Sequence, residues 1–297
     1  MKNLILLGAG ASHGSQLENS PPLGVGLFKE IEKKREELSI IPRSIKEIFY
    51  EDFEKGMVAL YDFSPKLAQV LQLAMAGYLA GFIPNRKNLY LKLLSNVKLR
   101  KTIFCTLNYD LLIEESGVAL GKTVGYFSNS KEQVKIIKPH GSSNFWPNTF
   151  GTTFVNCSIH SNSRDGVDFK GPVEAVSSYE SISRSKSNSG LCPAMAFYAP
   201  GKSVKWCRDY VHQHQKDWEK TALKAKKIFI SGVQINKLDT HIWDVVASTR
   251  ADVYFYGDKN AKASFDEWKR EVGKDNLYYL EGWFDFAVAD IARKIKG

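Results

Sequence analysis

The chain has 297 residues and is long enough to bury about three quarters of the surface that its unfolded form exposes. Hydrophobic residues at 43% and charged residues at 25% are typical of a soluble globular protein and do not indicate disorder. The formal net charge is +9, but the basic residues are scattered along the sequence. Scattered charge indicates a solvated surface, so we expect no direct binding of nucleic acid.

The four cysteines (Cys105, Cys157, Cys192 and Cys207) are far apart and form no C-x-x-C pair. We therefore expect neither a zinc ribbon nor a disulfide framework. No apolar stretch reaches the roughly 18 residues of a membrane span. The sequence begins a predicted core strand within three residues of its first methionine. We therefore expect a protein without a membrane segment, located in the reducing cytoplasm.

The first apolar run, residues 4–7, leads directly into residues 8–12, Gly-Ala-Gly-Ala-Ser. A short apolar run bounded by glycine predicts a buried parallel strand. Small residues after such a strand let backbone amides approach an anionic group, so a nucleotide phosphate is the expected ligand. The G-x-G-x-x-G pattern is only partly met, because His13 stands at its third glycine position, and an ordinary tight turn is the alternative.

Polar residues follow two further apolar runs. Residues 102–105 precede residues 106–110 (Thr-Leu-Asn-Tyr-Asp), and residues 134–138 precede residues 139–144 (Pro-His-Gly-Ser-Ser-Asn). The β-branched and aromatic content of both runs predicts strands. Because open α/β sheets bind ligands at the carboxyl ends of their strands, we expect both polar segments to face the same ligand.

Three later apolar runs, at residues 228–230, 253–256 and 277–280, predict further strands, the first two ending near Gly232 and Asp258. Helical patterns lie between these runs. Strands that alternate with helices predict an α/β fold with a Rossmann-like, mainly parallel sheet and helices on both faces.

Two segments interrupt this alternation. Residues from about 27 to 100 are mostly helical in pattern and predict a helical layer inserted between the first two strands. From about 149 to 203, serine, asparagine and glycine are frequent, which predicts a loop-rich insertion with a few short strands. We expect a single domain over residues 1–297 that contains both insertions.

With these motifs, the chain resembles the sirtuin superfamily, and more closely the sirtuin-like NAD-hydrolase domains of bacterial antiphage defence proteins. Residues 8–12 resemble the pyrophosphate turn, residues 106–110 the T-x-N-x-D element, and residues 139–141 the H-G element. The strands that end near Gly232 and Asp258 match less specifically. Together, the order of the motifs and their placement at strand ends make the resemblance specific.

The chain departs from sirtuin deacylases in two respects. It has no close cysteine pairs to form their zinc module, and residues 21–26 (Pro-Pro-Leu-Gly-Val-Gly) replace their acidic-arginine loop. The resemblance therefore implies cleavage of the nicotinamide bond rather than use of an acyl-lysine channel.

The resemblance implies that NAD is the substrate and that Asn108 and His140 are catalytic. Asn108 would orient a water or the ribose, and His140 would accept a proton from one of them. The implied NAD-binding residues are Gly8, Ala9, Gly10, Ala11, Ser12, Thr106, Asp110, Gly232 and Asp258.

Each of these roles has a structural alternative. Asn108 and Asp110 would cap the helix that follows them, His140 would be a hydrogen-bonded turn residue, and Asp258 would start a turn. Four other histidines (His160, His212, His214 and His241) are expected to be structural or exposed. With the cysteines scattered as well, we expect no metal.

The activity implied by the resemblance is an NAD glycohydrolase that splits NAD into nicotinamide and ADP-ribose as a toxic, NAD-depleting effector of antiphage defence. Activation would come from assembly into a homo-oligomer or from a partner, such as a HerA-type ATPase or another defence-system activator. Two alternatives stay open: a regulatory subunit that binds NAD or ADP-ribose without catalysis, and a sirtuin-type deacylase or ADP-ribosyltransferase.

Overall fold

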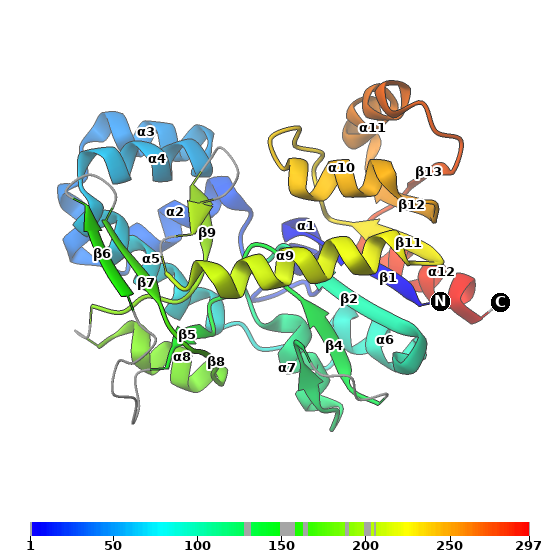
Figure 1. Ribbon diagram of the computed structural model, residues 1–297, viewed down its shortest axis with the longest axis horizontal. Coiled ribbons are helices and arrows are strands. Elements are labelled where there is room, and N and C mark those ends of the chain that lie inside the picture. Colours follow the sequence, from blue (N-terminus) through cyan, green and yellow to red (C-terminus); the bar gives the residue numbers. More distant parts are fainter. Residues whose placement is uncertain are drawn as a thin grey trace.

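A computed structural model describes residues 2–127, 132–148, 158–162, 166–187, 190–198, 203–204 and 206–296. Within these residues a seven-stranded sheet runs in the order β13-β12-β11-β1-β2-β4-β3, and each pair of neighbours is parallel. Helices cover both faces of this sheet (Figure 1). The predicted α/β class with a Rossmann-like parallel sheet is therefore confirmed.

The central strand of this sheet is β1, which is buried along its whole length. Leu7 at its end lies opposite Thr106 of β2 and Ser231 of β11, so these three strands end at the same level. The strands of the sheet are β1 (Asn3–Leu7), β2 (Thr102–Thr106), β3 (Val124–Gly125), β4 (Val134–Ile137), β11 (Lys227–Ser231), β12 (Asp252–Gly257) and β13 (Leu277–Glu281).

Alternate side chains of β1 enter two different cores. Leu4 and Leu6 pack with residues of α9 (Arg208–Leu223), α10 (Thr240–Ser248) and α11 (Lys259–Val272). Ile5 and Leu7 pack with residues from the opposite face, which include α6 (Leu89–Asn96), α7 (Leu112–Ala119) and α12 (Phe284–Lys296). This period of two is what a strand buried on both faces requires.

The segment between β1 and β2 is helical, as its pattern predicts. It contains α1 (Ala9–His13), α2 (Gly24–Glu32), η1 (Glu36–Ile40), α3 (Arg43–Glu51), α4 (Phe53–Phe63), α5 (Pro65–Ala80), α6 and η2 (Leu99–Lys101). Side chains cap three of these helices: Asp52 begins α4, Ser64 begins α5 and Asn88 begins α6. Figure 1 shows α2 to α5 gathered at the end of the molecule away from the sheet. The long helix α9 extends from the side of these helices toward the sheet.

The later insertion contains short strands, as expected, and a helix that the sequence analysis did not predict. The strands pair as β5 (Phe145–Pro147) with β8 (Val173–Ala175), β6 (Ser158–Asn162) with β7 (Gly166–Lys170), and β9 (Ala196–Tyr198) with β10 (Ser203–Val204). The serine-rich stretch Ser178–Ser185 forms helix α8, with Ser177 as its cap. It packs closely on α5, because a Cβ on Gly77 would lie 2.2 Å from the Ser185 hydroxyl oxygen.

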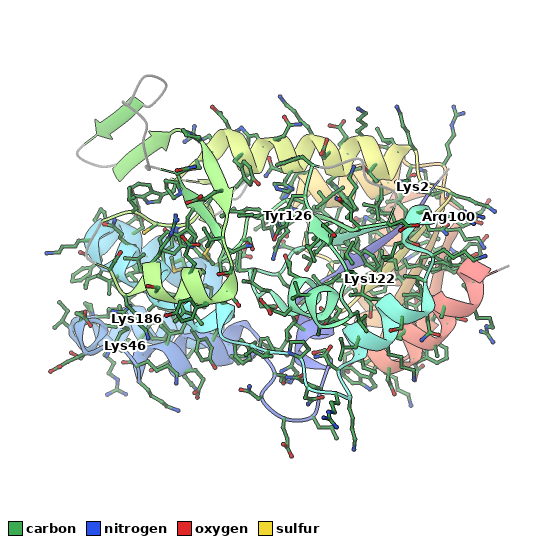
Figure 2. The ribbon with its side chains drawn as sticks, turned by 90° about the horizontal axis from the view of Figure 1, so that it is seen from below. Lys2, Lys46, Arg100, Lys122, Tyr126 and Lys186 are labelled. Atoms are coloured by element: carbon green, nitrogen blue, oxygen red, sulfur yellow. The ribbon has the colours of Figure 1, made fainter. Side chains whose placement is uncertain are left out.

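Among the described residues, no helix combines the length and the apolar character that crossing a bilayer requires. Figure 2 shows Lys2 and Arg100 at one end of the molecule and Lys46 and Lys186 at the other. These basic side chains do not form one patch. Among the described residues, the cysteines Cys105, Cys192 and Cys207 are buried and form no disulfide, while Cys157 lies outside the described residues.

The turns after β1 and β11 approach each other more closely than side chains would allow. Gly232 has a φ of +66°, and a Cβ on it would lie 2.0 Å from the Ala11 amide nitrogen. A Cβ on Gly8 would lie 2.4 Å from the Gly232 carbonyl oxygen. The Gly8 amide donates to Ser231 O at 3.0 Å, and the Gly10 amide donates to Gly232 O at 2.9 Å. Glycine is therefore required on both sides of this contact.

We expect Gly232→Ala to lower the free energy of unfolding by about 3 kcal/mol or more, since the left-handed backbone costs ~1–2 kcal/mol and the Cβ also displaces the neighbouring turn. Gly273→Ala is the matched control, because Gly273 has the same φ of +66° with nothing within 4 Å of its Cβ position. Urea unfolding measures both variants. Equal losses at the two positions would contradict a role for the close approach.

Candidate functional site

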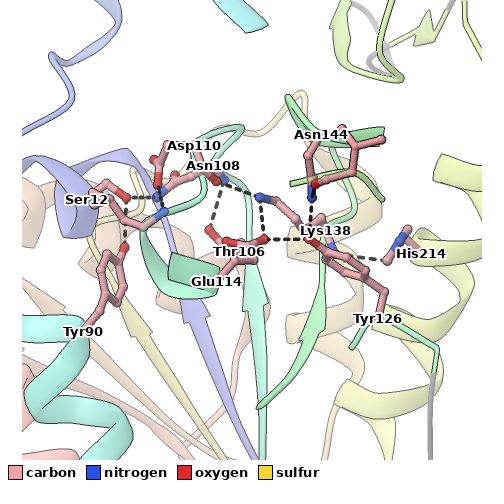
Figure 3. A network of polar contacts seen from close by, with 12 residues as sticks. Ser12, Tyr90, Thr106, Asn108, Asp110, Glu114, Tyr126, Lys138, Asn144 and His214 are labelled. Carbon is pink, nitrogen blue, oxygen red and sulfur yellow. Dashed lines mark hydrogen bonds and ion pairs between the residues drawn. The ribbon is translucent and has the colours of Figure 1, made fainter. Parts of the chain in front are cut away.

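The candidate site lies where four neighbouring strands, β11, β1, β2 and β4, reach their carboxyl ends. Three of the predicted motifs and the Gly232 turn follow these strands. Hydrogen bonds connect each of these segments to the next, as the following contacts show. Figure 3 shows the part of this network that involves side chains.

Backbone amides of the turn after β1 donate to carbonyl oxygens of the protein itself, beginning with the Gly8 amide described above. Gly10 N donates to Gly232 O, and Ala11 N donates to Gly8 O, both at 2.9 Å. Ala9 is exposed at the tip of the turn. A phosphate at this turn would therefore compete with carbonyl oxygens for the amides of Gly10 and Ala11.

Asn108 connects the end of β2 to the β1 turn. Its Nδ2 donates to Gly8 O at 2.9 Å and to Ser12 Oγ at 2.8 Å, and its backbone N–H donates to Thr106 Oγ1 at 3.1 Å. Because a carbonyl oxygen can only accept, the contact with Gly8 fixes which end of the amide is nitrogen. Both amide hydrogens are thus in use, and Oδ1 is the group that Asn108 can offer to a ligand.

The predicted phosphate ligand Ser12 is buried beneath the turn. Its hydroxyl accepts the hydrogen bond from Asn108 and lies 2.9 Å from the hydroxyl of Tyr90 on α6. Burial raises the pKa of Tyr90 well above its ordinary value. The Ser12 hydroxyl therefore holds Asn108 in place in this structure.

Asp110 lies just before helix α7, whose N-cap position is Leu111. Its Oδ1 accepts from the amide of Leu112, the first residue of the helix, at 3.0 Å, which is close to the capping alternative considered for this residue. The side chain of Asn108 makes its bonds to the β1 turn instead. Burial raises the pKa of Asp110 above its ordinary value of 3.8, and the nearby Lys138 ammonium opposes part of this rise.

Lys138, the last residue before Pro139, is fully buried and connects β4 to the Asn108 segment. Its Nζ donates to Asp110 O at 2.8 Å and to Glu114 Oε1 at 3.0 Å. The Ser143 amide, from the same polar segment as His140, donates to Tyr109 O at 3.1 Å. Neither Lys138 nor Glu114 is a site residue that the sequence predicts, since a lysine at a strand end and a glutamate in a helix are usually exposed.

The network continues from Glu114 toward α9. The Tyr126 hydroxyl donates to Glu114 Oε1, and Asn144 Nδ2 donates to the Tyr126 oxygen, each at 3.1 Å. Burial and the Glu114 carboxylate raise the pKa of Tyr126 well above its ordinary value. Tyr126 is therefore protonated and acts as a donor.

His214 on α9 is buried among aromatic rings. Its Nδ1 accepts from Lys138 N at 3.2 Å, and its ring is stacked on Phe145 with centroids 5.0 Å apart. Burial, assisted by the Lys138 charge, lowers the pKa of His214 to about 3. The prediction that His214 is structural agrees with this position.

His140 is buried, and its Nε2 lies 3.0 Å from Nε2 of His241, a residue in the first turn of α10. Asp239, which precedes α10, is also buried. Ligand atoms of these three side chains lie within 4.8 Å of one another, so they could hold a metal ion. This pairing is not predictable from local sequence, because 101 residues separate the two histidines. The only signal in the sequence is the position of His241 after a predicted strand.

Two other predicted site residues have structural positions. Gly232 contacts the β1 turn through its backbone. Asp258 caps α11, because its Oδ1 accepts from Asn260 N and Ala261 N. Among the described hydrogen bonds, none joins the Asp258 side chain to the segments that carry Asn108 or His140.

No protein-family model matches the chain, and no curated protein is significantly similar to it. The functional argument therefore depends on the chemistry of these residues and on the motifs that carry them. The structure brings Gly8, Ser12, Thr106 and Asn108 into one hydrogen-bonded group at the sheet edge.

Lowering the pH from 7 to 5 should reduce the free energy of unfolding of the wild type by about 2 kcal/mol more than that of His214→Gln. The folded pKa of about 3 lies below the ordinary 6.5, so the unfolded chain takes up the proton first, and stability falls as the pH drops below 6.5. Denaturant unfolding at several pH values measures this difference. His212→Gln, at an exposed position on the same helix, is the control. Parallel pH profiles for wild type and His214→Gln would contradict the burial of a neutral imidazole.

Proposed function

We propose that the protein is an NAD glycohydrolase that splits NAD into nicotinamide and ADP-ribose. The observation that carries the proposal is the position of Asn108, whose two amide hydrogens are bound to Gly8 O and Ser12 Oγ. The amide is thereby fixed at the sheet edge where open α/β sheets bind nucleotides, with Oδ1 as an acceptor.

This acceptor fits the reaction. Cleavage of an N-glycosidic bond develops oxocarbenium character at the anomeric carbon, as in other glycoside hydrolysis. In the proposed mechanism, Asn108 Oδ1 accepts a hydrogen bond from the attacking water or from a ribose hydroxyl and orients it. An amide does this without a full negative charge, which would trap the cation.

His140 is the proposed proton acceptor. Its imidazole takes the proton from the water or from the ribose hydroxyl as the bond to nicotinamide breaks. The 3.0 Å contact with His241 holds the ring of this buried residue in one orientation. Asp110 is proposed to contact the nicotinamide carboxamide, and residues 8–12 to contact the phosphates.

The biological role is proposed from the resemblance of the three motifs to sirtuin-like NAD hydrolases of antiphage defence. In this role the protein acts in the cytoplasm and depletes NAD when it is activated. Assembly into a homo-oligomer, or binding of a HerA-type ATPase or another defence-system protein, would supply the activation. The proposal includes neither a metal cofactor nor direct contact with nucleic acid.

The proposal is tested by incubating the full chain with NAD, alone and with the protein encoded next to it, and by separating the products. We expect nicotinamide and ADP-ribose, with a loss of rate of about 100-fold or more in Asn108→Ala and His140→Ala. Asn96→Ala on α6 and His212→Ala on α9 are matched controls of the same residue types away from the sheet edge, and both should retain full activity.

Two outcomes would overturn the proposal. If NAD binds but is not consumed under either condition, the protein is a nucleotide-binding regulator. If both variants at the sheet edge hydrolyse NAD at the wild-type rate, the site lies elsewhere.

A further inference from the structure

Three side chains with metal-binding groups meet beside the proposed catalytic histidine. His140 follows β4, Asp239 immediately precedes α10 and His241 lies in its first turn, and their ligand atoms are within 4.8 Å of one another. We propose that these three residues bind one divalent transition-metal ion of the zinc class. The binding does not depend on the function proposed above.

The spacing of the two imidazoles fits a shared metal. In a tetrahedral zinc site with Zn–N bonds of ~2.0–2.1 Å, two nitrogen ligands lie about 3.3 Å apart. The two Nε2 atoms of His140 and His241 lie 3.0 Å apart. Small side-chain rotations can move the two atoms a few tenths of an ångström further apart, which would make room for the ion.

The chemistry of the three groups selects the metal. Two imidazole nitrogens and one carboxylate suit Zn²⁺, Co²⁺, Ni²⁺ and Fe²⁺, whereas Mg²⁺ and Ca²⁺ prefer oxygen ligands. Three protein ligands leave one coordination position of a tetrahedral ion for water or another small ligand. The set therefore predicts an open site rather than a closed structural one.

The backbone that carries the three residues is held from several directions. His140 O accepts from Ala196 N at 2.9 Å, and His241 O accepts from Trp218 Nε1 at 3.1 Å. Asp239 O accepts from the amide of Ile242 at 2.9 Å. These bonds are made by main-chain oxygens, so they fix the backbone positions from which the three side chains converge.

His241 is the proposed point of entry for the ion. His241 is partly exposed and lines a groove between α9 and α10 together with His212, Lys216, Glu219 and Asp244. His140 and Asp239 are buried. The site thus has one accessible ligand and two shielded ones.

The test uses the full chain after treatment with a chelator, with Co²⁺ and Zn²⁺ as probes. We expect one Co²⁺ per chain by equilibrium dialysis and metal analysis, with the visible absorption of a four- or five-coordinate ion. His241→Ala and Asp239→Asn should each weaken binding by at least the roughly 10- to 100-fold that loss of an outer-shell partner costs. His212 is a histidine of the same groove, and His212→Ala should bind Co²⁺ as tightly as the wild type does. Circular dichroism checks that each variant is folded.

Three results would overturn the proposal: the wild type binds no Co²⁺, it binds Co²⁺ with octahedral absorption only, or folded His241→Ala binds as tightly as the wild type. The first would show that the two histidines only share a proton.

A second measurement concerns regulation and rests on the proposed function. A metal ion bound to His140 makes its imidazole a weaker proton acceptor, so Zn²⁺ should inhibit NAD hydrolysis by the wild type, and a chelator should restore it. His212→Ala should be inhibited as the wild type is. If NAD is never hydrolysed, the glycohydrolase proposal fails while the metal measurement stands. If activity is present and Zn²⁺ at saturating occupancy leaves it unchanged, the inhibitory role is wrong.

Discussion

The parallel register of the three central strands is the constraint on which the rest of the site depends. Leu7 lies opposite both Thr106 and Ser231, so the turns after β1, β2 and β11 leave the sheet at one level. The turns after β1 and β11 therefore lie very close together. Glycine at positions 8 and 232 allows this approach, because a Cβ at either position would overlap the neighbouring backbone.

Buried polar groups then connect these turns to one another. Lys138 carries a charge that is wholly shielded from solvent, and such a charge is tolerated only with close partners. The Glu114 carboxylate and the Asp110 carbonyl oxygen supply them. The same ammonium therefore neutralises a buried acid and fixes the spacing of β2 and β4 at the edge that carries Asn108 and His140.

Much of this organisation can be predicted from the sequence. Short apolar runs bounded by glycine or by polar residues identify the strands, because β1, β2 and β4 are buried along nearly all of their length. Parallel strands place their carboxyl ends together, which brings Asn108 and His140 to one edge without any knowledge of contacts. The mostly helical segment before β2 follows from its periodicity in the same way.

The remainder depends on tertiary contacts that local patterns do not encode. Nothing near Lys138 in the sequence indicates that its partner is Glu114, and nothing near His140 indicates His241. Helix α8 is rich in serine, a poor helix former, and is stabilised by its cap and by packing against Gly77 of α5. In each case the deciding interaction joins residues far apart in the chain.

The amide of Asn108 has a consequence for how this sequence can diverge. Its two hydrogens serve Gly8 and Ser12 at once, and Ser12 also contacts Tyr90. Replacing any one of these side chains leaves a buried partner unsatisfied, whereas replacing both members of a bonded pair removes the mismatch between those two. Substitutions at positions 12, 90 and 108 should therefore be non-additive, and epistasis would cause these positions to change as a group in related chains.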